Sequence, residues 1–439
     1  MIQEASFTVP TDFNLRKFVL NESQKHNYFC VFSSSDLESD IYREYDFLIA
    51  VGCQKKIELF NGENSFEKLN HFVSNAKLKV FGVLSYDLKN EIYPGYFSSQ
   101  KNTFPHLAFF EPLTLISKKV NSNTVSIQTY SSEKKDYFIN KLQTPDIQSE
   151  ADANPQTSNI DAPFKCNFTK EEYTATVNSI KNDLESGDIY ELNLCLEFSS
   201  QMKRFNSGRI FLTLNEMSPS PFSALFSFGD YKLISSSPER YLKNKNGHLV
   251  AQPIKGTRQR SADFYTDERL KDELREDKKE IAENVMIVDL MRNDLAKVAQ
   301  AGSIEVPELF KIYSFKHVHQ MISTITATLD ENKFQWSDAV KASFPMGSMT
   351  GAPKLRAMER IELYEKNDRK WYSGALGYIS PNGSFDLSVV IRSILYDAQS
   401  ERMSFQAGSA ITWDALAENE WEECLLKAEA MKKAIQRSL

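Results

Sequence analysis

The sequence predicts an α+β protein with large antiparallel sheets. Short apolar runs bounded by turn residues recur along most of the chain, which is the pattern of β-strands. Long helical segments occur between some of these runs, but the regular strand–helix alternation of βαβ units is absent. Parallel strands need a crossover connection that is usually a helix, so an excess of strands favours antiparallel pairing.

The composition limits the possible classes of function. The chain has 439 residues, of which 41% are hydrophobic and 25% are charged, so a sizeable core can be buried. A net charge of −7 argues against a nucleic-acid or anionic-membrane partner. No stretch approaches the roughly 18 apolar residues of a membrane span. The five cysteines lack CxxC pairing and the six histidines lack an HExxH pair, which indicates a reducing, cytoplasmic protein without a zinc site.

The chain divides into three predicted parts. Residues 1–143 form an N-terminal region with strands at FCVFSSS, FLIAVGC, KVFGVLSYDL and HLAFF. Residues 144–163 lose almost all large apolar side chains and are predicted to be an exposed loop or linker. Residues 164–439 form the main functional region, which we expect to make one intertwined body with the N-terminal region.

The second region opens with a strong helix. Thr169 and Glu172 have the spacing of a capping box, and Gly187 ends the helical pattern. The strand IYELNLCLEF follows. Further strands are predicted at FSALFSF, KLISSS, VHQMISTITATL, YSGALGYIS, FDLSVVIRSILY and RMSFQAGSAIT, and long helices at 275–298, 354–366 and 416–438.

Lys255 stands between Ile254 and Gly256, at the predicted end of a strand. In such a setting the amine can be desolvated, which lowers its pKa and provides a neutral nucleophile. Gly256 would let a ligand approach the backbone closely. The alternative is an ordinary solvent-exposed lysine in a turn.

Two predicted helices have regularly spaced carboxylates. Glu280 and Glu283 are three residues apart on one helix, and Glu420, Glu423 and Lys427 share a face of the last helix. If the two faces meet, their carboxylates suit a hard cation such as magnesium. The alternative is a pair of solvated amphipathic faces.

Three other segments have unusual local sequences. The turn FPMGSMTGAPK at 344–354 opens into a helix and either binds an anion there or only starts the helix. Tyr372 begins a glycine-containing strand, which indicates close approach of another backbone or a ligand. Arg392 lies within SVVIRSIL and needs an anion such as a carboxylate if it points inward, but faces solvent otherwise. Glu239 follows SSSP and is either a catalytic acid or a turn residue.

Taken together, these segments resemble the chorismate-utilising enzyme family. The motifs occur in the family's order and spacing over about residues 165–435: GDIYELNLC, SSSPERYL, PIKGTR, KEIAENVMIVDLMRNDL, TGAPKLRAMERIE, YSGALGYIS, IRSI and EECLLKA. The resemblance implies two large, mainly antiparallel sheets packed face to face, with helices on the outside, and chorismate as the substrate. The N-terminal FGVLSYDLKNEIYPG resembles a family segment near which some relatives bind tryptophan.

Lys255 separates two branches of the family. Anthranilate synthases add nitrogen at C2 of chorismate and resemble this segment, but with alanine in the form PIAGT. PIKGT resembles the aminodeoxychorismate synthases, which place nitrogen at C4 on the route to 4-aminobenzoate and folate. The resemblance therefore implies amination at C4 by way of a neutral Lys255, with anthranilate synthesis as the alternative.

The resemblance also implies roles for other residues. It implies that Glu239 is the general acid/base, that Glu283 and Glu423 bind Mg²⁺, and that Glu280 and Glu420 act through metal-bound water. The groups that it places around the substrate are Thr257, Tyr372, Arg392, the backbone near Gly408, and Lys427.

Other features of the sequence concern the source of nitrogen and departures from the family pattern. No G-x-C-x-G nucleophile segment is present, so the resemblance implies ammonia supplied by a separate glutaminase subunit. Gln320 stands where many relatives have histidine, with His319 just before it, and Gly408 begins Gly-Ser-Ala rather than a more glycine-rich segment. Glu191 replaces a commoner glutamine and has no interpretation from sequence.

Overall fold

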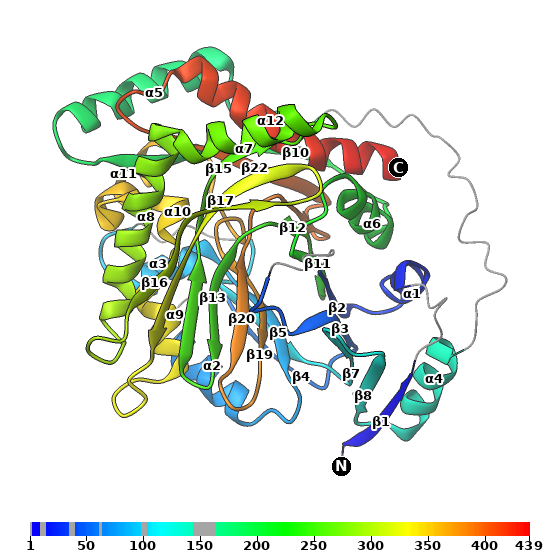
Figure 1. The fold of residues 1–439 in the computed structure, drawn as a ribbon. Helices are drawn as coiled ribbons and strands as arrows, with labels where there is room; N and C mark the ends of the chain where they lie inside the picture. The colour runs from blue at the N-terminus through cyan, green and yellow to red at the C-terminus, as the bar shows by residue number, and fades with distance from the viewer. Residues whose placement is uncertain (1, 9–14, 35–39, 61–63, 98–102, 144–163) are drawn as a thin grey trace.

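The structure is a computed structural model that describes residues 2–8, 15–34, 40–60, 64–97, 103–143 and 164–439. Within these residues the chain forms two antiparallel sheets that lie against each other, with helices on their outer faces (Figure 1). This arrangement confirms the α+β class and the two packed sheets. The predicted linker at 144–163 lies outside the described residues, and the division of the chain into regions stays a prediction.

The first sheet combines strands from both halves of the chain. Its strand β2 from the N-terminal region pairs with β11 from the second region. In spatial order its strands are β1 (Gln3–Thr8), β8 (Thr124–Thr129), β7 (Thr114–Lys119), β3 (Tyr45–Val51), β2 (Tyr28–Ser33), β11 (Phe222–Phe228), β12 (Tyr231–Ser237), β21 (Ser393–Asp397), β22 (Arg402–Ile411), β10 (Glu191–Gln201) and β18 (Gly351–Ala352), with β9 (Lys165–Cys166) beside β10.

The second sheet is also shared between the two regions, because β5 pairs with β19. Its strands in spatial order are β15 (Ile254–Gln259), β17 (Val318–Thr328), β14 (His248–Gln252), β13 (Arg240–Lys245), β20 (Phe385–Val389), β19 (Ala375–Ile379), β5 (Val80–Leu84), β6 (Leu107–Glu111) and β4 (Lys55–Leu59), with β16 (Glu305–Ser314) beside β17.

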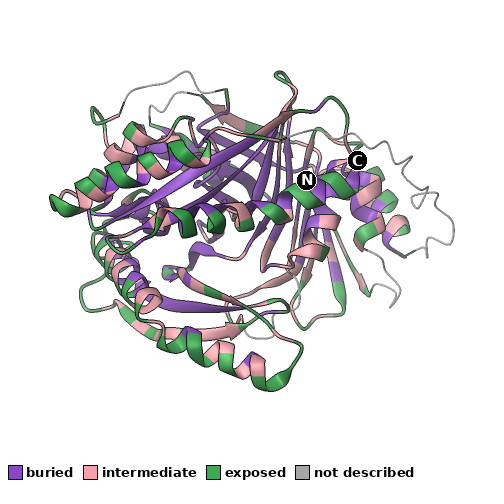
Figure 2. Cartoon of the chain, turned by 90° about the horizontal axis from the view of Figure 1, so that it is seen from above, coloured by how far each residue is buried: buried purple, intermediate pink, exposed green. Residues whose placement is uncertain are grey.

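Three apolar cores hold the layers together. One core joins the facing sides of the two sheets and includes Phe226 of one and Phe81 of the other. Figure 2 shows these strands as mostly buried and the surrounding helices as largely exposed on their outer sides.

The second core covers the outer face of the first sheet. Its helices are α1 (Leu15–Glu22), α4 (Ser132–Gln143), α5 (Lys170–Glu185), α6 (Ser207–Met217), α11 (Lys354–Tyr364) and α12 (Ala417–Ser438). The third core covers the second sheet with α2 (Ser65–Ser74), α8 (Lys278–Ala296), α9 (Trp336–Ser343) and α10 (Gly347–Thr350). The remaining helices are α3 (Lys89–Ile92), α7 (Phe264–Glu276) and a 3-10 turn at Tyr86–Leu88. No helix among the described residues is long and apolar enough to cross a membrane.

The capping box and the three long predicted helices are confirmed. The Thr169 hydroxyl accepts from the backbone N–H of Glu172, whose side chain accepts from the N–H of Thr169. The predicted single strand FDLSVVIRSILY is wrong, because it forms β20 in one sheet and β21 in the other. Arg392 lies where the chain crosses between the sheets, and its φ of 50° is incompatible with an extended strand.

Candidate active site

Lys255 is buried between two carboxylates that come from distant parts of the chain. It lies on β15, and its side chain is only 9% exposed. Its Nζ donates to Glu191 Oε1 at 2.7 Å and to Glu283 Oε2 at 3.3 Å. Glu191 begins β10 in the opposite sheet, whereas Glu283 lies on α8. The lysine is therefore a buried side chain with fixed partners, and the alternative of a solvent-exposed turn is excluded.

The protonation of Lys255 differs from the prediction. Burial alone would lower its pKa, but the carboxylates of Glu191 and Glu283 outweigh burial and raise the pKa of Lys255 above its ordinary value. The predicted neutral amine is therefore wrong for this state of the protein, because two buried carboxylates stabilise the ammonium form. Any reaction that uses this amine as a nucleophile must first remove its proton.

Gly256 lets the strand pass close to two helices. Its φ is 86°, a backbone conformation that favours glycine. A Cβ here would lie 2.9 Å from Leu274 Cδ1 and 3.2 Å from Glu280 Cβ. The glycine thus serves the approach of β15 to α7 and α8, and through it the placement of Lys255 beside α8.

The acidic faces of α8 and α12 meet, and Lys279 lies between them. Lys279 Nζ is 3.2 Å from Glu420 Oε1 and 3.9 Å from Glu283 Oε1. Glu283 is 7% exposed and Glu420 is 3% exposed, so these are not solvated faces. Glu423 is about half exposed and lies 2.6 Å from Lys427 Nζ. The helices therefore gather carboxylates and lysines in one place.

The carboxylates in this cluster repel one another. Burial raises the pKa of Glu283 to about 7, with Lys255 opposing the shift and Glu191 and Glu280 adding to it. Burial also raises the pKa values of Glu280 and Glu420, and the charge of Glu423 adds to both shifts. Partial burial would raise the pKa of Glu423 as well, but Lys427 lowers it instead.

This donor set fits a magnesium ion. The acidic side chains offer carboxylate oxygens, which Mg²⁺ prefers, beside the ammonium groups of Lys279 and Lys427. Within the described residues, no group of three or more His, Cys, Asp or Glu side chains is arranged to hold a metal ion. Magnesium commonly uses only one or two protein carboxylates and completes its shell with water and substrate. Magnesium binding at Glu283 and Glu423 stays a prediction.

Glu239 lies at the junction of β12 and β13 with a hydroxyl partner. Its side chain is 5% exposed, and Ser348 Oγ donates to Glu239 Oε1 at 2.7 Å. Burial raises the pKa of Glu239 to about 7, with Ser348 and Lys255 opposing the shift. Near neutral pH the carboxyl group can therefore both give and take a proton.

The predicted turn at 344–354 supplies this hydroxyl. Ser348 belongs to α10, and Gly351, which follows it, has a φ of 136°. A Cβ at Gly351 would lie 2.0 Å from the carbonyl oxygen of Glu191. The small residues of this turn therefore let it pack against the start of β10, close to both Glu191 and Glu239.

Arg392 is a half-buried cation that forms no ion pair with the described residues. Within the described part of the chain, no residue makes a hydrogen bond or salt bridge to its side chain. Burial lowers its pKa, while Tyr372 and Glu423 raise it, so both lie near the guanidinium. Tyr372 is 4% exposed, and its hydroxyl accepts from Cys195 Sγ at 3.8 Å. A half-buried guanidinium without a protein anion among the described residues suits a planar carboxylate ligand.

Gly408 and Lys427 lie beside the carboxylates of α8 and α12, since Lys427 pairs with Glu423. Lys427 Nζ donates to the carbonyl oxygen of Gly408 at 2.9 Å. A Cβ at Gly408 would lie 2.4 Å from Asn193 Oδ1 and 2.7 Å from Cys195 Sγ, so only glycine fits here. The carbonyl of Gly408 thus orients Lys427, and contact of this backbone with a substrate stays a prediction.

The structure brings most of the predicted residues together, but not all. Thr257 is exposed, and its side chain is not among those that bond within the cluster. His319 is buried away from it, with its ring nitrogens 2.8 Å from Ser314 Oγ and 3.0 Å from Asp267 Oδ1. Gln320 points to the opposite face of β17 by strand alternation.

Glu191 is the site residue that sequence reasoning missed. The only signal for it in the sequence was that glutamate stands where relatives more commonly have glutamine.

Comparison with known proteins places the chain in a family. The model of the chorismate binding enzyme family matches residues 20–433. The chain is similar to anthranilate synthase component 1 of Bacillus subtilis, with 34% identity over 417 residues, which cover 87% of this chain and 80% of that protein. It is also similar to aminodeoxychorismate synthase component 1 of Escherichia coli, with 37% identity over 291 residues, covering 66% of this chain and 63% of that protein.

Other relatives named anthranilate synthase component 1 are matched over only 52–59% of their length. Among solved structures, the fold is similar to anthranilate synthase component I from Streptococcus pneumoniae, with a TM-score of 0.76 and 25% identity over 91% of this chain and 94% of that one. The match to the family model covers every strand of the two sheets except β1, and every residue of the cluster. The chain therefore belongs to the chorismate binding enzyme family.

Proposed function

We propose that this chain aminates chorismate at C4 with ammonia and releases 4-amino-4-deoxychorismate. The observation that supports this most strongly is Lys255, a buried primary amine held by Glu191 and Glu283. A lysine here matches the C4-aminating branch of the family, whereas the anthranilate synthases have alanine. Relatives named for the C4 reaction are 37–42% identical to this chain.

The reaction consists of two allylic displacements. After losing a proton, Lys255 Nζ forms a bond to C2 of chorismate, both ring double bonds shift, from C1=C2 to C1=C6 and from C5=C6 to C4=C5, and the C4–O bond breaks. Glu239 protonates the departing hydroxyl, which leaves as water. Ammonia then bonds to C4, both double bonds shift back, and the C2–N bond breaks to release Lys255. Chorismate and ammonia thus give aminodeoxychorismate and water, with retention at C4.

Glu191 is the nearest acceptor for the lysine proton. It lies 2.7 Å from Nζ, and its other oxygen, Oε2, is buried without a hydrogen-bond partner among the described residues. Arg392, Tyr372 and Lys427 hold the carboxylates of the substrate, because Arg392 pairs with no anion among the residues that the structure describes. Glu283 and Glu423 would hold a magnesium ion, which supplies positive charge for the ring carboxylate, with Glu280 and Glu420 beside them.

Ammonia is proposed to come from a separate glutaminase subunit. The E. coli relative is named component 1, which agrees with a second component. The five cysteines are free thiols, and burial raises the pKa of Cys195 well above its ordinary value, which makes it a poor nucleophile for glutamine hydrolysis. Free thiols also agree with a reducing, cytoplasmic setting for folate synthesis.

The second candidate is anthranilate synthase component I. It is favoured by relatives of that name with 34–39% identity, which is close to the identity of the C4-aminating relatives. Overall similarity therefore does not separate the two reactions. The lysine at position 255 is the feature that favours C4.

Product identity tests the proposal. The purified chain is incubated with chorismate, magnesium and ammonium at alkaline pH, and an aminodeoxychorismate lyase is added to half of the sample. We expect 4-aminobenzoate only in the half that contains the lyase, as seen by chromatography with mass detection. Anthranilate in both halves would mean that nitrogen enters at C2 and would support the second candidate.

A further inference from the structure

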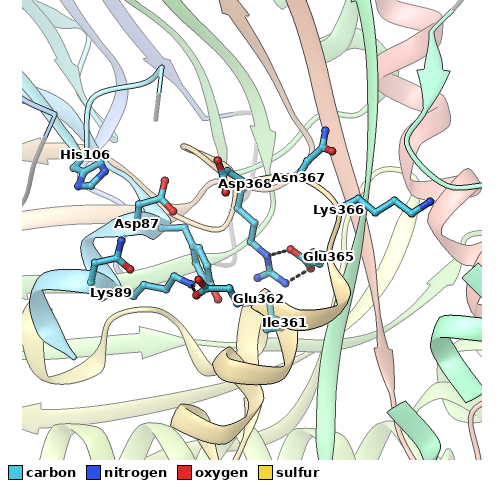
Figure 3. Close-up of a pocket in the computed structure, with 12 residues that line it drawn as sticks. Asp87, Lys89, His106, Ile361, Glu362, Glu365, Lys366, Asn367 and Asp368 are labelled. Atoms are coloured by element: carbon cyan, nitrogen blue, oxygen red, sulfur yellow. Dashed lines mark hydrogen bonds and ion pairs between the residues drawn. The ribbon is translucent and has the colours of Figure 1, made fainter. Parts of the chain in front are cut away.

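Titratable side chains also gather outside the predicted active site. One such place is the pocket between the turn after β5 and the end of α11 (Figure 3). There Glu365 pairs with Arg369 at 2.6 Å and Glu362 pairs with Lys89 at 3.1 Å, so each of these two acids already has a basic partner. Another is the place where α7 packs against the hairpin of β16 and β17. This second group differs from the first because it includes an exposed hydroxyl.

Ser314 and His319 are neighbours across the hairpin of β16 and β17. Ser314 is the last residue of β16, and His319 on β17 is its partner in the antiparallel register. Side chains of such a pair project from the same face of a sheet. The hydroxyl oxygen of Ser314 is 2.8 Å from Nδ1 of His319. Ser314 is exposed and the histidine side chain is only 1% exposed, so the hydroxyl is the end of the pair that a molecule from solution can reach.

Helix α7 supplies a carboxylate on the other side of the imidazole. Nε2 of His319 is 3.0 Å from Oδ1 of Asp267. Asp267 is itself held by Arg260, whose Nη2 donates to Oδ2 at 2.6 Å, and by the backbone N–H of Ser261, which donates to Oδ1 at 2.9 Å. The hydrogen bonds from Arg260 and Ser261 keep the pKa of Asp267 below its ordinary value, so its carboxyl group stays ionised.

The carboxylate determines which nitrogen of a neutral His319 carries the proton. An ionised carboxylate only accepts hydrogen bonds, so Nε2 is the protonated nitrogen and donates to Asp267. Nδ1 then keeps its lone pair, and the hydrogen bond to Ser314 must run from the hydroxyl to Nδ1. A hydroxyl that donates to an imidazole nitrogen, with the imidazole oriented by a carboxylate, is the arrangement that activates serine nucleophiles.

We propose that Ser314 is a nucleophile that accepts acyl groups from small esters, with His319 as its general base. The Ser314 oxygen bonds to the carbonyl carbon of the ester while Nδ1 takes the hydroxyl proton. The C–O bond to the alcohol then breaks, and the alcohol leaves with the proton from Nδ1. Water releases the acyl group as a carboxylic acid by the same steps and restores Ser314, so ester and water give acid and alcohol. Asp267 is a positioning residue, because it acts through the imidazole.

The turn after Ser314 has donors that suit the negative charge formed on the carbonyl oxygen. The backbone N–H groups of Lys316 and His317 make no hydrogen bond to the backbone of another described residue. Lys316 is exposed, and its ammonium group adds positive charge at this turn. Free N–H donors and positive charge stabilise such an oxyanion. The site shares no residue with the predicted amination site, so the proposal does not depend on the proposed function.

Covalent labelling of the full chain tests the proposal. A fluorophosphonate bonds to an activated serine hydroxyl with loss of fluoride, and mass spectrometry of peptides locates the label. We expect Ser314 to be labelled at least 100-fold faster than Ser186, which is also exposed but donates its hydroxyl to the backbone carbonyl of Asp183. The chain should also release p-nitrophenol from p-nitrophenyl acetate, and Ser314→Ala should slow this release at least tenfold.

Variants of the two partners separate activation of the hydroxyl from its exposure. His319→Gln keeps a polar side chain but removes the base, and should slow the labelling of Ser314 at least 100-fold. Asp267→Asn should slow the labelling as well, and Asp267→Glu should restore part of the rate. Ser186→Ala is the control and should leave the labelling of Ser314 unchanged.

Three results would overturn the proposal. Labelling of Ser314 no faster than that of Ser186 would mean an ordinary hydroxyl. Equal labelling rates in the unchanged chain and in His319→Gln would mean that the histidine is not the base. Labelling of Ser314 with no release of p-nitrophenol above that of Ser314→Ala would mean that the hydroxyl does not transfer acyl groups. The first comparison uses only the unchanged chain, so it decides even if a variant fails to fold.

Discussion

At the scale of single residues, the protonation of Lys255 depends on its carboxylate partner Glu191. The local sequence around Lys255 correctly indicated burial, but not the two carboxylates that pair with it. Those partners lie 64 and 28 residues away in the chain, and only the meeting of β10, β15 and α8 brings them together. The burial of a side chain can partly be predicted from its neighbours in the sequence. The direction of its pKa shift cannot, because it depends on charged groups that only the tertiary structure brings near.

Replacing this partner gives a first prediction. Glu191→Gln keeps the shape of the side chain but removes one charge from the pair with Lys255. A hydrogen bond to a charged group contributes about 1.5–3 kcal/mol, so we expect the amination rate to fall about 10- to 100-fold. The KM for chorismate should change little, because Glu191 pairs with the amine and not with the substrate carboxylates.

A matched control is available on the same strand. Glu197 is also buried in β10 and pairs with Lys370 and Arg402, away from Lys255. Glu197→Gln should lower stability without a selective loss of amination. If steady-state kinetics give the same rate constant for Glu191→Gln as for the unchanged chain, the assigned role of Glu191 is wrong.

At the scale of elements, local signals identified helices better than strands. The capping box at Thr169 and the regular spacing of apolar residues were sufficient for α5, α8, α11 and α12. The run FDLSVVIRSILY looked continuous because both of its halves are apolar, yet it changes sheet at Arg392. Nothing local marks this crossing, since a non-glycine residue with positive φ is held there by the surrounding structure.

A substitution at Gly256 tests how closely β15 packs against α7 and α8. Gly256→Ala introduces a Cβ at a φ of 86° and 2.9 Å from Leu274 Cδ1. Gly187→Ala is the matched control, because Gly187 has a similar φ of 79° but nothing within 4 Å of the added Cβ. Both variants should lose about 1 kcal/mol from backbone strain.

The substitution at Gly256 should lose a further ~1 kcal/mol or more, on the scale of an overpacking effect. Urea denaturation measures both variants against the unchanged chain. Equal losses for the two variants would show that β15 can move away from α7 and α8 without a penalty, contrary to the close packing of this strand on the two helices.

The meeting of α8 and α12 predicts the metal dependence. Glu283→Gln removes one of the two proposed magnesium ligands, and we expect the magnesium concentration for half-maximal activity to rise at least tenfold. Asp289→Asn changes an exposed carboxylate on the same helix and is the control. An unchanged magnesium requirement in Glu283→Gln would exclude this residue as a ligand.

At the scale of the whole molecule, the two packed sheets followed from the family resemblance and not from periodicity. Alternating strands indicate antiparallel pairing but do not say how many sheets form or which strands neighbour each other. The N-terminal strands complete both sheets, as the pairs β2–β11 and β5–β19 show.

Buried acids predict how stability depends on pH. The pKa of Glu239 is raised to about 7 and that of Asp87 to about 6, so these two carboxyl groups bind more protons in the folded chain than in the unfolded chain between about pH 4 and pH 7. Their contribution to stability is fully present below about pH 4 and is lost as the pH rises through about 7. Glu239→Gln removes one of these titrations.

The loss of unfolding free energy between about pH 5 and pH 8 should therefore be smaller in Glu239→Gln by about 2 kcal/mol. Urea denaturation at the two pH values measures it. Glu429→Gln, at an exposed position paired with Lys433, should keep the original pH dependence. If Glu239→Gln also keeps it, the pKa of the Glu239 carboxyl group is not raised by burial.

The central claim is that Lys255 directs nitrogen to C4 of chorismate. The most direct measurement is the position of ¹⁵N in the product when the unchanged chain and Lys255→Ala react with chorismate, magnesium and ¹⁵N-ammonium. We predict ¹⁵N on C4 with the unchanged chain, and at least a 100-fold slower formation of that product with Lys255→Ala. Formation of the C4 product by Lys255→Ala at an undiminished rate, or ¹⁵N on C2 with the unchanged chain, would contradict the claim.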